Sequence, residues 1–227
     1  MSDAQDPHAG QPVLRVGVPV ERARLVAILI HGRGASAADI LSLRDELSAA
    51  DVAYLAPQAA GSTWYPYSFL SPISQNEPGI TSGLGTIARL IAEVAAQGVP
   101  QERVVLLGFS QGACLLAEYV SRHPANYGGV AILTGGLIGP PGTTWEGASL
   151  EGTPIVLATS DVDDWVPLAR TEGTRDVFTA RGGEVTWRVY EGMEHIINDD
   201  EVRLVGDLLA AGDEQRRRRA DDMPTLD

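Results

Sequence analysis

The segment that most limits what this chain can fold into runs from Val104 to Ala113, where an apolar run meets a Gly-x-Ser-x-Gly turn. The run Val104–Leu107 is aliphatic without alternation, which is typical of a strand buried on both faces of a parallel sheet. Beyond the turn, apolar residues recur with the helical period of 3.6, at Ala113, Leu116, Ala117 and Val120. The pattern predicts a strand, a sharp turn and a helix, with Ser110 in the turn.

The glycines of this turn, Gly108 and Gly112, have a mechanical explanation. Glycine permits a sharp turn and a close approach of neighbouring backbone, where a side chain would clash. Ser110 would then lie at a helix N-terminus, where backbone N–H groups and the helix dipole favour a developing anion. We interpret the turn as a nucleophile elbow; an ordinary serine in a glycine-bracketed turn is the alternative, and the flanking strand and helix favour the elbow.

Length and composition favour one globular domain. With 227 residues and 44% hydrophobic content, the chain can bury a full core without a disulfide or a metal. The single cysteine, Cys114, excludes an internal disulfide framework and fits a reducing compartment. No apolar run approaches the ~18 residues of a membrane span, and residues 1–12 lack the apolar core of a signal peptide. We expect a cytoplasmic protein without membrane insertion: a polar tail at 1–12, a domain at 13–211 and a charged tail at 212–227.

The charge of the chain excludes several classes of partner and cofactor. A formal net charge of −13 argues against nucleic acid, which requires a basic surface. The basic run Arg216–Arg219 lies in a tail that also carries acidic residues, so we expect a solvated tail. Lysine is absent, which excludes Schiff-base chemistry and pyridoxal-type cofactors. The acidic run 198–201 suggests either a metal site or the dipole-stabilised first turn of a helix; we expect the helix, and neither a metal nor another cofactor.

Strand-like and helix-like segments alternate along the chain. Strands are expected at Leu14–Val20, Leu25–Ile30, Val52–Ala56, Val104–Leu107, Val130–Leu133, Pro154–Ala158 and Glu184–Tyr190. Helices are expected from Ser36 to Leu47, around Leu84–Val94, from Ala113 to His123, and at Leu168–Ala180 and Ile196–Ala211. Such alternation predicts a single α/β domain with a doubly wound, mostly parallel sheet and helices on both faces. The ligand site should lie beyond the carboxyl ends of the strands.

A serine hydroxyl needs a base, and the base needs an orienting acid. Three of the four histidines have structural explanations, in a tail, after a strand or before a proline: His8, His31 and His123. The fourth, His195, follows the last predicted strand. The acid candidates lie in the loop after the preceding strand: Asp161, Asp163 and Asp164. Serine, aspartate and histidine then follow in the order that α/β-hydrolases use.

The long loop from Gln58 to Gly79 groups several aromatic side chains, and loops of this length in compact domains tend to be functional. Together with an apolar loop after the strand at Val130–Leu133, it supplies the candidate substrate-binding residues Trp64, Tyr65, Tyr67, Phe69, Leu137 and Ile138. The alternative is that these aromatic residues form a small core of the loop itself.

Four ordered motifs together resemble a known family. They are His31-Gly32-x-Gly34, Gly108-Phe109-Ser110-Gln111-Gly112-Ala113, Asp161-x-Asp163-x-x-Val166-Pro167 and Tyr190-Glu191-Gly192-Met193-x-His195. The chain resembles the phospholipase/carboxylesterase family of α/β-hydrolases, which includes the acyl-protein thioesterases, and its aromatic loop looks more like that of bacterial esterases. The resemblance implies a catalytic triad of Ser110, Asp163 and His195. It also implies an oxyanion hole formed by the backbone N–H groups of Arg33 and Gln111.

The function that we expect is hydrolysis of carboxylic esters with short to medium acyl chains, through an acyl-enzyme on Ser110. Acyl thioester hydrolysis and dienelactone-type hydrolysis are alternatives within the enzymes. A non-catalytic ligand-binding protein on the same fold is the alternative from another class, and the presence of all three triad positions argues against it. We expect a small-molecule ester as partner and leave a homodimer open. The Arg33 side chain is a candidate to pair with a substrate carboxylate, so its loss should hardly affect neutral esters.

Overall fold

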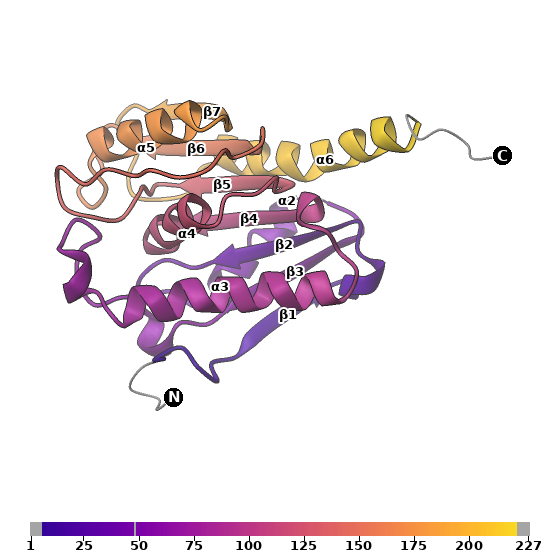
Figure 1. The fold of residues 1–227 in the computed structure, drawn as a ribbon, viewed down its shortest axis with the longest axis horizontal. Helices are drawn as coiled ribbons and strands as arrows, with labels where there is room; N and C mark the ends of the chain where they lie inside the picture. Colours follow the sequence, from indigo (N-terminus) through magenta and orange to yellow (C-terminus); the bar gives the residue numbers. More distant parts are fainter. Residues whose placement is uncertain (1–5, 48, 222–227) are drawn as a thin grey trace.

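The computed structural model describes residues 6–47 and 49–221, and these form one layered α/β unit (Figure 1). Seven strands make a single sheet in the order β1-β3-β2-β4-β5-β6-β7. They are β1 Val13–Gly17, β2 Leu25–Ile30, β3 Val52–Pro57, β4 Val104–Phe109, β5 Gly129–Leu133, β6 Pro154–Ser160 and β7 Glu184–Tyr190. Strand β1 pairs antiparallel with β3, and every other pairing is parallel. The predicted α/β-hydrolase domain with a mostly parallel sheet is confirmed.

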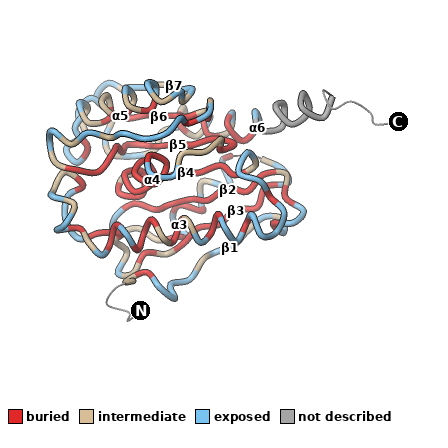
Figure 2. The backbone as a smooth tube through the Cα atoms, in the orientation of Figure 1, coloured by how far each residue is buried: buried red, intermediate tan, exposed pale blue. Residues whose placement is uncertain are grey.

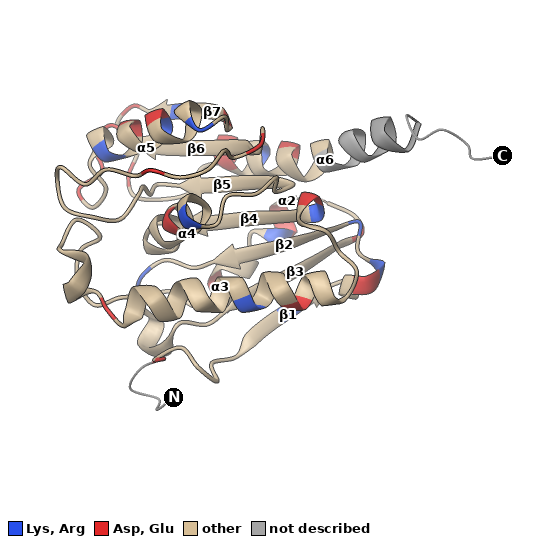
Figure 3. Cartoon of the chain, in the orientation of Figure 1, with Lys and Arg blue, Asp and Glu red and all other residues tan. Residues whose placement is uncertain are grey.

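Helices cover both faces of the sheet. They are α1 Ala37–Leu41, α2 Arg44–Leu47, α3 Gly79–Ala96, α4 Gln111–Arg122, α5 Leu168–Ala180 and α6 Asp199–Asp221. Because side chains alternate along a strand, β2 supplies two cores: Val26 and Ile28 pack with α3, α4 and α5, whereas Leu25 and Ala27 pack with α1, α2 and α6. Figure 2 shows the central strands buried, and Figure 3 shows that charged residues lie mainly on helices and loops. The sheet is therefore a rigid support for the loops at its carboxyl edge.

Several element boundaries differ from the predicted ones. The expected helix from Ser36 to Leu47 is broken into α1 and α2, and the Ser42 hydroxyl donates to the Asp39 carbonyl at the break. The last helix begins at Asp199, three residues later than expected, after a cap in which Asn198 and Glu201 exchange hydrogen bonds of 2.9 Å. It continues to Asp221, so the expected tail boundary at residue 212 lies within α6. Residues 222–227 lie outside the described part.

Part of the segment before β1, predicted as a polar tail, packs against the domain at His8, while residues 9–12 are exposed. His8 is 4% exposed. Its backbone N–H donates to the Ser82 hydroxyl at 3.0 Å, and the Pro12 carbonyl accepts from the Gln58 N–H at 2.9 Å. The first residues of the predicted tail, 1–5, lie outside the described ranges. Within those ranges, no helix is long and apolar enough to cross a membrane.

Candidate active site

Ser110 lies in a strained turn between β4 and α4. Its φ of 55° and ψ of −122° are values that a side chain rarely adopts, and they are typical of functional turns. Glycines make the turn possible: a Cβ on Gly108 would lie 2.6 Å from the Gly112 carbonyl oxygen, and one on Gly112 would lie 2.5 Å from the His31 carbonyl oxygen. The elbow expected from the sequence is therefore present as a backbone structure, with Ser110 at the start of α4.

A chain of two hydrogen bonds links Ser110, His195 and Asp163. His195 Nε2 lies 2.8 Å from Ser110 Oγ, and His195 Nδ1 lies 2.6 Å from Asp163 Oδ2. The three residues follow β4, β7 and β6, so the carboxyl edge of the sheet brings them together. With the Nδ1 proton donated to Asp163, Nε2 is left to accept the serine proton, which is the arrangement that a general base needs.

Asp163 holds its own loop as well as the histidine. Its second oxygen accepts the backbone N–H groups of Trp165 and Val166, both at 2.8 Å, and its side chain is fully buried. Burial opposes ionisation, but the hydrogen bonds from His195 and these two amides outweigh it and hold the pKa of Asp163 below its ordinary value. The carboxylate is therefore ionised near neutral pH, as the orienting acid must be.

The other two acid candidates do not reach the histidine. Asp161 Oδ1 accepts the Gly192 N–H at 2.8 Å and so fixes the turn before His195, while Asp164 is exposed. The same turn is held by the Ser160 hydroxyl, which donates to the Met193 carbonyl at 2.6 Å. Asp161 therefore supports the loop that carries His195, without contacting the imidazole.

The amides of Arg33 and Gln111 lie on the two segments that flank Ser110. Within the described residues, neither N–H has a protein acceptor, so both are available to a developing oxyanion. His31 fixes the first of these segments: its Nε2 accepts the Ala59 N–H at 3.0 Å, and its Nδ1 donates to the Gly32 carbonyl at 2.7 Å. Burial lowers the pKa of His31, which keeps the ring neutral and able to accept.

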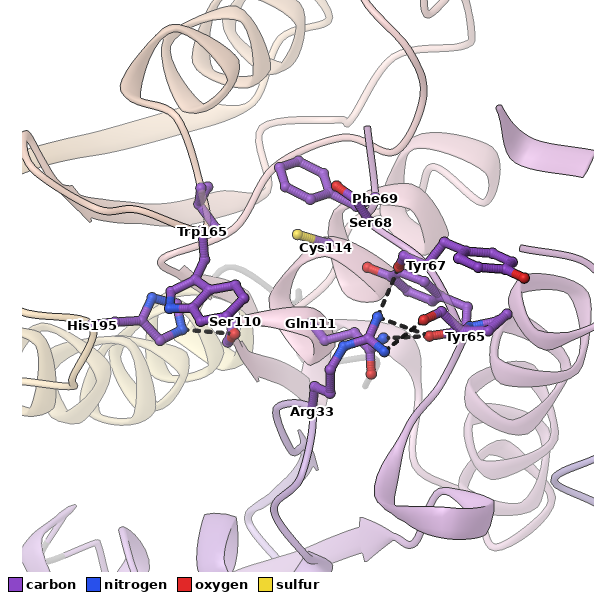
Figure 4. Close-up of a pocket in the computed structure, with 12 residues that line it drawn as sticks. Arg33, Tyr65, Tyr67, Ser68, Phe69, Ser110, Gln111, Cys114, Trp165 and His195 are labelled. Carbon is purple, nitrogen blue, oxygen red and sulfur yellow. Dashed lines mark hydrogen bonds between the residues drawn. The ribbon is translucent and has the colours of Figure 1, made fainter. Parts of the chain in front are cut away.

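A pocket of about 550 Å³ opens over Ser110 (Figure 4). It is lined by Arg33, Tyr65, Pro66, Tyr67, Ser68, Phe69, Ser110, Gln111, Cys114, Trp165, Val166 and His195. Three of the aromatic candidates, Tyr65, Tyr67 and Phe69, therefore form part of its wall. The buried aromatic residues of the loop belong to the main core of the domain and do not form a core of their own, and their role in substrate binding stays a prediction.

The other three substrate-binding candidates lie outside the pocket lining. Trp64 is fully buried behind the wall, where its indole N–H donates to the His31 carbonyl at 2.9 Å. Leu137 and Ile138 are fully buried as well, because the Thr174 hydroxyl and the Glu118 carboxylate accept their backbone N–H groups. The polar partners remove the cost of burying these amides, so the loop packs into the core.

Five lining residues are absent from the predicted site, Pro66, Ser68, Cys114, Trp165 and Val166, and two of them carry large or reactive side chains, Trp165 and Cys114. Cys114 follows Ser110 by four residues, so helical spacing could have placed it on the same face of α4. Burial raises the pKa of its thiol to about 12, which leaves it protonated and excludes it as a competing nucleophile. Trp165 is 73% exposed, and no pattern in the sequence distinguishes it from a core tryptophan.

Comparison with known proteins agrees with this geometry. A family model described as phospholipase/carboxylesterase matches residues 12–211. The crystal structure of a phospholipase/carboxylesterase from Dyadobacter fermentans is similar at a TM-score of 0.84 and 38% identity, over 88% of this chain and 97% of that one. Acyl-protein thioesterase 1 of Eremothecium gossypii is 27% identical over 219 residues, 87% of this chain and 90% of the relative. Acyl-protein thioesterase 2 of Zea mays shares the fold, with a TM-score of 0.67, 18% identity, and coverage of 89% of this chain and 99% of that one.

Proposed function

The chain belongs to the phospholipase/carboxylesterase family of α/β-hydrolases, which act on ester bonds, and on that premise we propose that it hydrolyses carboxylic esters through an acyl-enzyme on Ser110. The observation that carries this proposal is the hydrogen-bonded chain from Ser110 through His195 to Asp163, open to a pocket of about 550 Å³. Chain order and geometry match those of a serine hydrolase.

In the proposed first step, His195 Nε2 takes the proton of Ser110 as Oγ attacks the ester carbonyl. The negative charge that forms on the carbonyl oxygen is met by the N–H groups of Arg33 and Gln111, and one such donor is worth about 3 kcal/mol in comparable sites. His195 then gives its proton to the departing alcohol as the C–O bond breaks. In the second step a water molecule attacks the acyl-enzyme, with His195 again as base, and releases the acid and free Ser110.

We propose short to medium acyl chains as substrates. The pocket wall includes Tyr65, Phe69 and Cys114, whose bulk and burial favour a compact apolar acyl group. A thioester substrate is the second candidate, because relatives named acyl-protein thioesterase match most of the chain. A panel of esters and thioesters from acetyl to palmitoyl decides between the two substrate classes. We expect butyryl or hexanoyl esters to exceed palmitoyl esters in kcat/KM. A palmitoyl thioester as the best substrate would contradict the proposal.

The test of the mechanism is labelling with a fluorophosphonate. Ser110 is expected to be the labelled residue, and Ser110→Ala is expected to lose both labelling and hydrolysis. Ser149→Ala, which changes an exposed serine far along the chain, is the matched control and should retain both. A label on another residue, or turnover undiminished in Ser110→Ala, would contradict the proposed mechanism.

We propose the cytoplasm as the location and a small ester as the partner, without nucleic acid. The buried free thiol of Cys114 supports a reducing compartment, and the charge of −13 supports the absence of nucleic acid. A homodimer stays open, and the molecular mass in solution decides it.

A further inference from the structure

The Arg33 side chain is exposed at the rim of the pocket and lies against the aromatic loop, defined here as residues 63–70 (Figure 4). Its Nη2 donates to the carbonyl of Tyr65 at 2.9 Å and to that of Tyr67 at 2.7 Å, and its Nη1 donates to the carbonyl of Pro66 at 2.9 Å. Three consecutive carbonyls of the pocket wall therefore converge on one guanidinium.

The Gln111 side chain lies beside Arg33 and holds the same loop (Figure 4). Its amide nitrogen donates to the Tyr65 carbonyl at 2.8 Å, and its amide oxygen accepts the Trp64 N–H at 2.9 Å. The residues whose backbone N–H groups face the substrate oxygen thus both use their side chains to hold the pocket wall. Gln111 is 6% exposed, so its bonds are made in a site with little competing water.

The Arg33 guanidinium forms no ion pair with a carboxylate among the described residues. Among the described residues, no acidic side chain lies within ion-pair distance of its guanidinium, which contacts the loop carbonyls and lies 5.9 Å from the centre of the Tyr65 ring. A planar fork with fixed donor directions can join carbonyls in this way with little loss of conformational freedom. Three of its donor hydrogens are already used, which argues against recognition of a carboxylate on the substrate.

Resting on the proposed function, we propose that the Arg33 side chain is a positioning residue that joins the pocket wall and the oxyanion hole into one unit. The backbone of Arg33 supplies a donor to the oxyanion, while its side chain fixes the carbonyls of Tyr65–Tyr67. Loss of the guanidinium removes the three hydrogen bonds that tie the loop carbonyls to the segment carrying the Arg33 amide, while Gln111 still holds the loop at Trp64 and Tyr65. Misplacement of catalytic groups by about 1 Å can cost on the order of 100-fold in rate, so the effect reaches neutral and charged substrates alike.

The experiment compares Arg33→Ala with Arg181→Ala on a neutral ester and on an otherwise identical ester that carries a carboxylate. Arg181 is the matched control, because it also binds backbone carbonyls, those of Ala148 and Ser121, but far from the pocket lining. We expect Arg33→Ala to lower kcat/KM about tenfold to a hundredfold on both esters. Arg181→Ala is expected to lower the melting temperature without changing kcat/KM.

Chemical rescue supplies a measurement that a merely structural role would not affect. Ethylguanidinium at millimolar concentration should enter the space left in Arg33→Ala and restore part of kcat/KM, with no effect on the wild type or on Arg181→Ala. If Arg33→Ala does not fold, Arg33→Lys takes its place, because one ammonium nitrogen cannot match the planar fork, and a loss of about threefold or more on both esters is expected.

Three results would overturn the proposal. They are kcat/KM within about twofold of wild type on both esters for the folded Arg33 variant, a loss confined to the carboxylate-bearing ester, and absence of rescue in folded Arg33→Ala. A wild-type protein without hydrolysis and without a label on Ser110 would instead contradict the proposed function, so the two failures are distinguishable.

Discussion

The two walls of the pocket are built in opposite ways. In the aromatic loop, Trp64 is fully buried and Phe69 is 6% exposed. The opposite wall belongs to the loop after β6, residues 161–167, which we call the acid loop because it carries Asp163. There, Trp165 is 73% exposed and Val162 is 58% exposed. Each wall has one exception, since Tyr67 of the aromatic loop is 58% exposed and Val166 of the acid loop is 3% exposed. The aromatic loop nevertheless buries most of its large side chains, whereas Trp165 and Val162 of the acid loop are exposed to solvent.

The acid loop is nevertheless fixed, but through its backbone. The Asp163 carboxylate accepts the N–H groups of Trp165 and Val166, so the proposed catalytic acid also shapes this wall. An exposed tryptophan at a pocket mouth is typical of a contact surface for a ligand. The difference teaches that the two walls are suited to different tasks: we expect the aromatic loop to fix the geometry of the proposed reaction, and the acid loop with Trp165 to offer apolar area to a substrate.

The largest effect is expected from Asp163→Asn. This variant separates the two roles of the carboxylate, which are to orient His195 and to hold the backbone of the acid loop. Asparagine can still accept the amides of Trp165 and Val166 through its oxygen, so the wall should persist. Its NH₂ group would face His195 Nδ1 and favour the wrong tautomer, which costs about 10⁴-fold in kcat in comparable triads. We expect KM to change little, as measured by steady-state kinetics. Asp161→Asn is the control, and an equal loss of kcat there would contradict the assignment of the acid.

A pair of tryptophan variants tests the contrast between the walls. Trp64→Phe removes the donor to the His31 carbonyl and should destabilise the protein by about 1–3 kcal/mol. Trp165→Ala should leave the melting temperature nearly unchanged, because the side chain is 73% exposed. It should instead raise KM several-fold at similar kcat. Thermal unfolding and kinetics of both variants check this, and the idea fails if Trp165→Ala is the less stable variant or binds substrate as the wild type does.

The smallest effect concerns the stability of the protein at low pH, which depends on two buried histidines behind the aromatic loop. His8 Nδ1 accepts the Ala60 N–H at 3.1 Å and His31 Nε2 accepts the neighbouring Ala59 N–H at 3.0 Å, so both rings must stay neutral. Burial lowers the pKa of each below its ordinary value near 6.5. The unfolded chain therefore binds more protons, and stability present above pH 6.5 is lost as the pH falls below it.

His8→Gln removes one of these titrating groups. Its melting temperature should fall less than that of the wild type between pH 7 and pH 5, by a difference of a few degrees at most. Calorimetry across this range measures the difference. Parallel curves for the two proteins would show that His8 does not contribute to the acid sensitivity.

Sequence patterns correctly predicted the element boundaries that are determined by residues close together along the chain. The bounds of β2, α5 and β7 agree with the predicted Leu25–Ile30, Leu168–Ala180 and Glu184–Tyr190, because apolar runs and turn residues determine them locally. The order of strand ends also indicated that Ser110, His195 and one of three aspartates would meet, and the resemblance to the family selected Asp163 among the three.

Contacts between distant segments could not be predicted in this way. His8 is buried because its Nε2 bonds the Trp64 carbonyl, 56 residues away. Glu118 is 3% exposed because it accepts the Ile138 N–H and pairs with Arg122, and this carries the loop after β5 into the core. Polar residues of this kind are assigned to the surface by any local pattern, since a single sequence does not indicate their partners.

The close contact at Gly112 has a consequence for how the active site tolerates change. A Cβ there would lie 2.5 Å from the His31 carbonyl oxygen, and a Cβ on Gly32 would lie 3.3 Å from Ser110 Cβ. Two main chains in close contact therefore set the distance between Ser110 and the proposed oxyanion donor, the Arg33 N–H, and this distance does not depend on a side-chain rotamer. The two backbone segments are already as close as atomic contact allows, so a substitution can increase the distance between them but cannot decrease it.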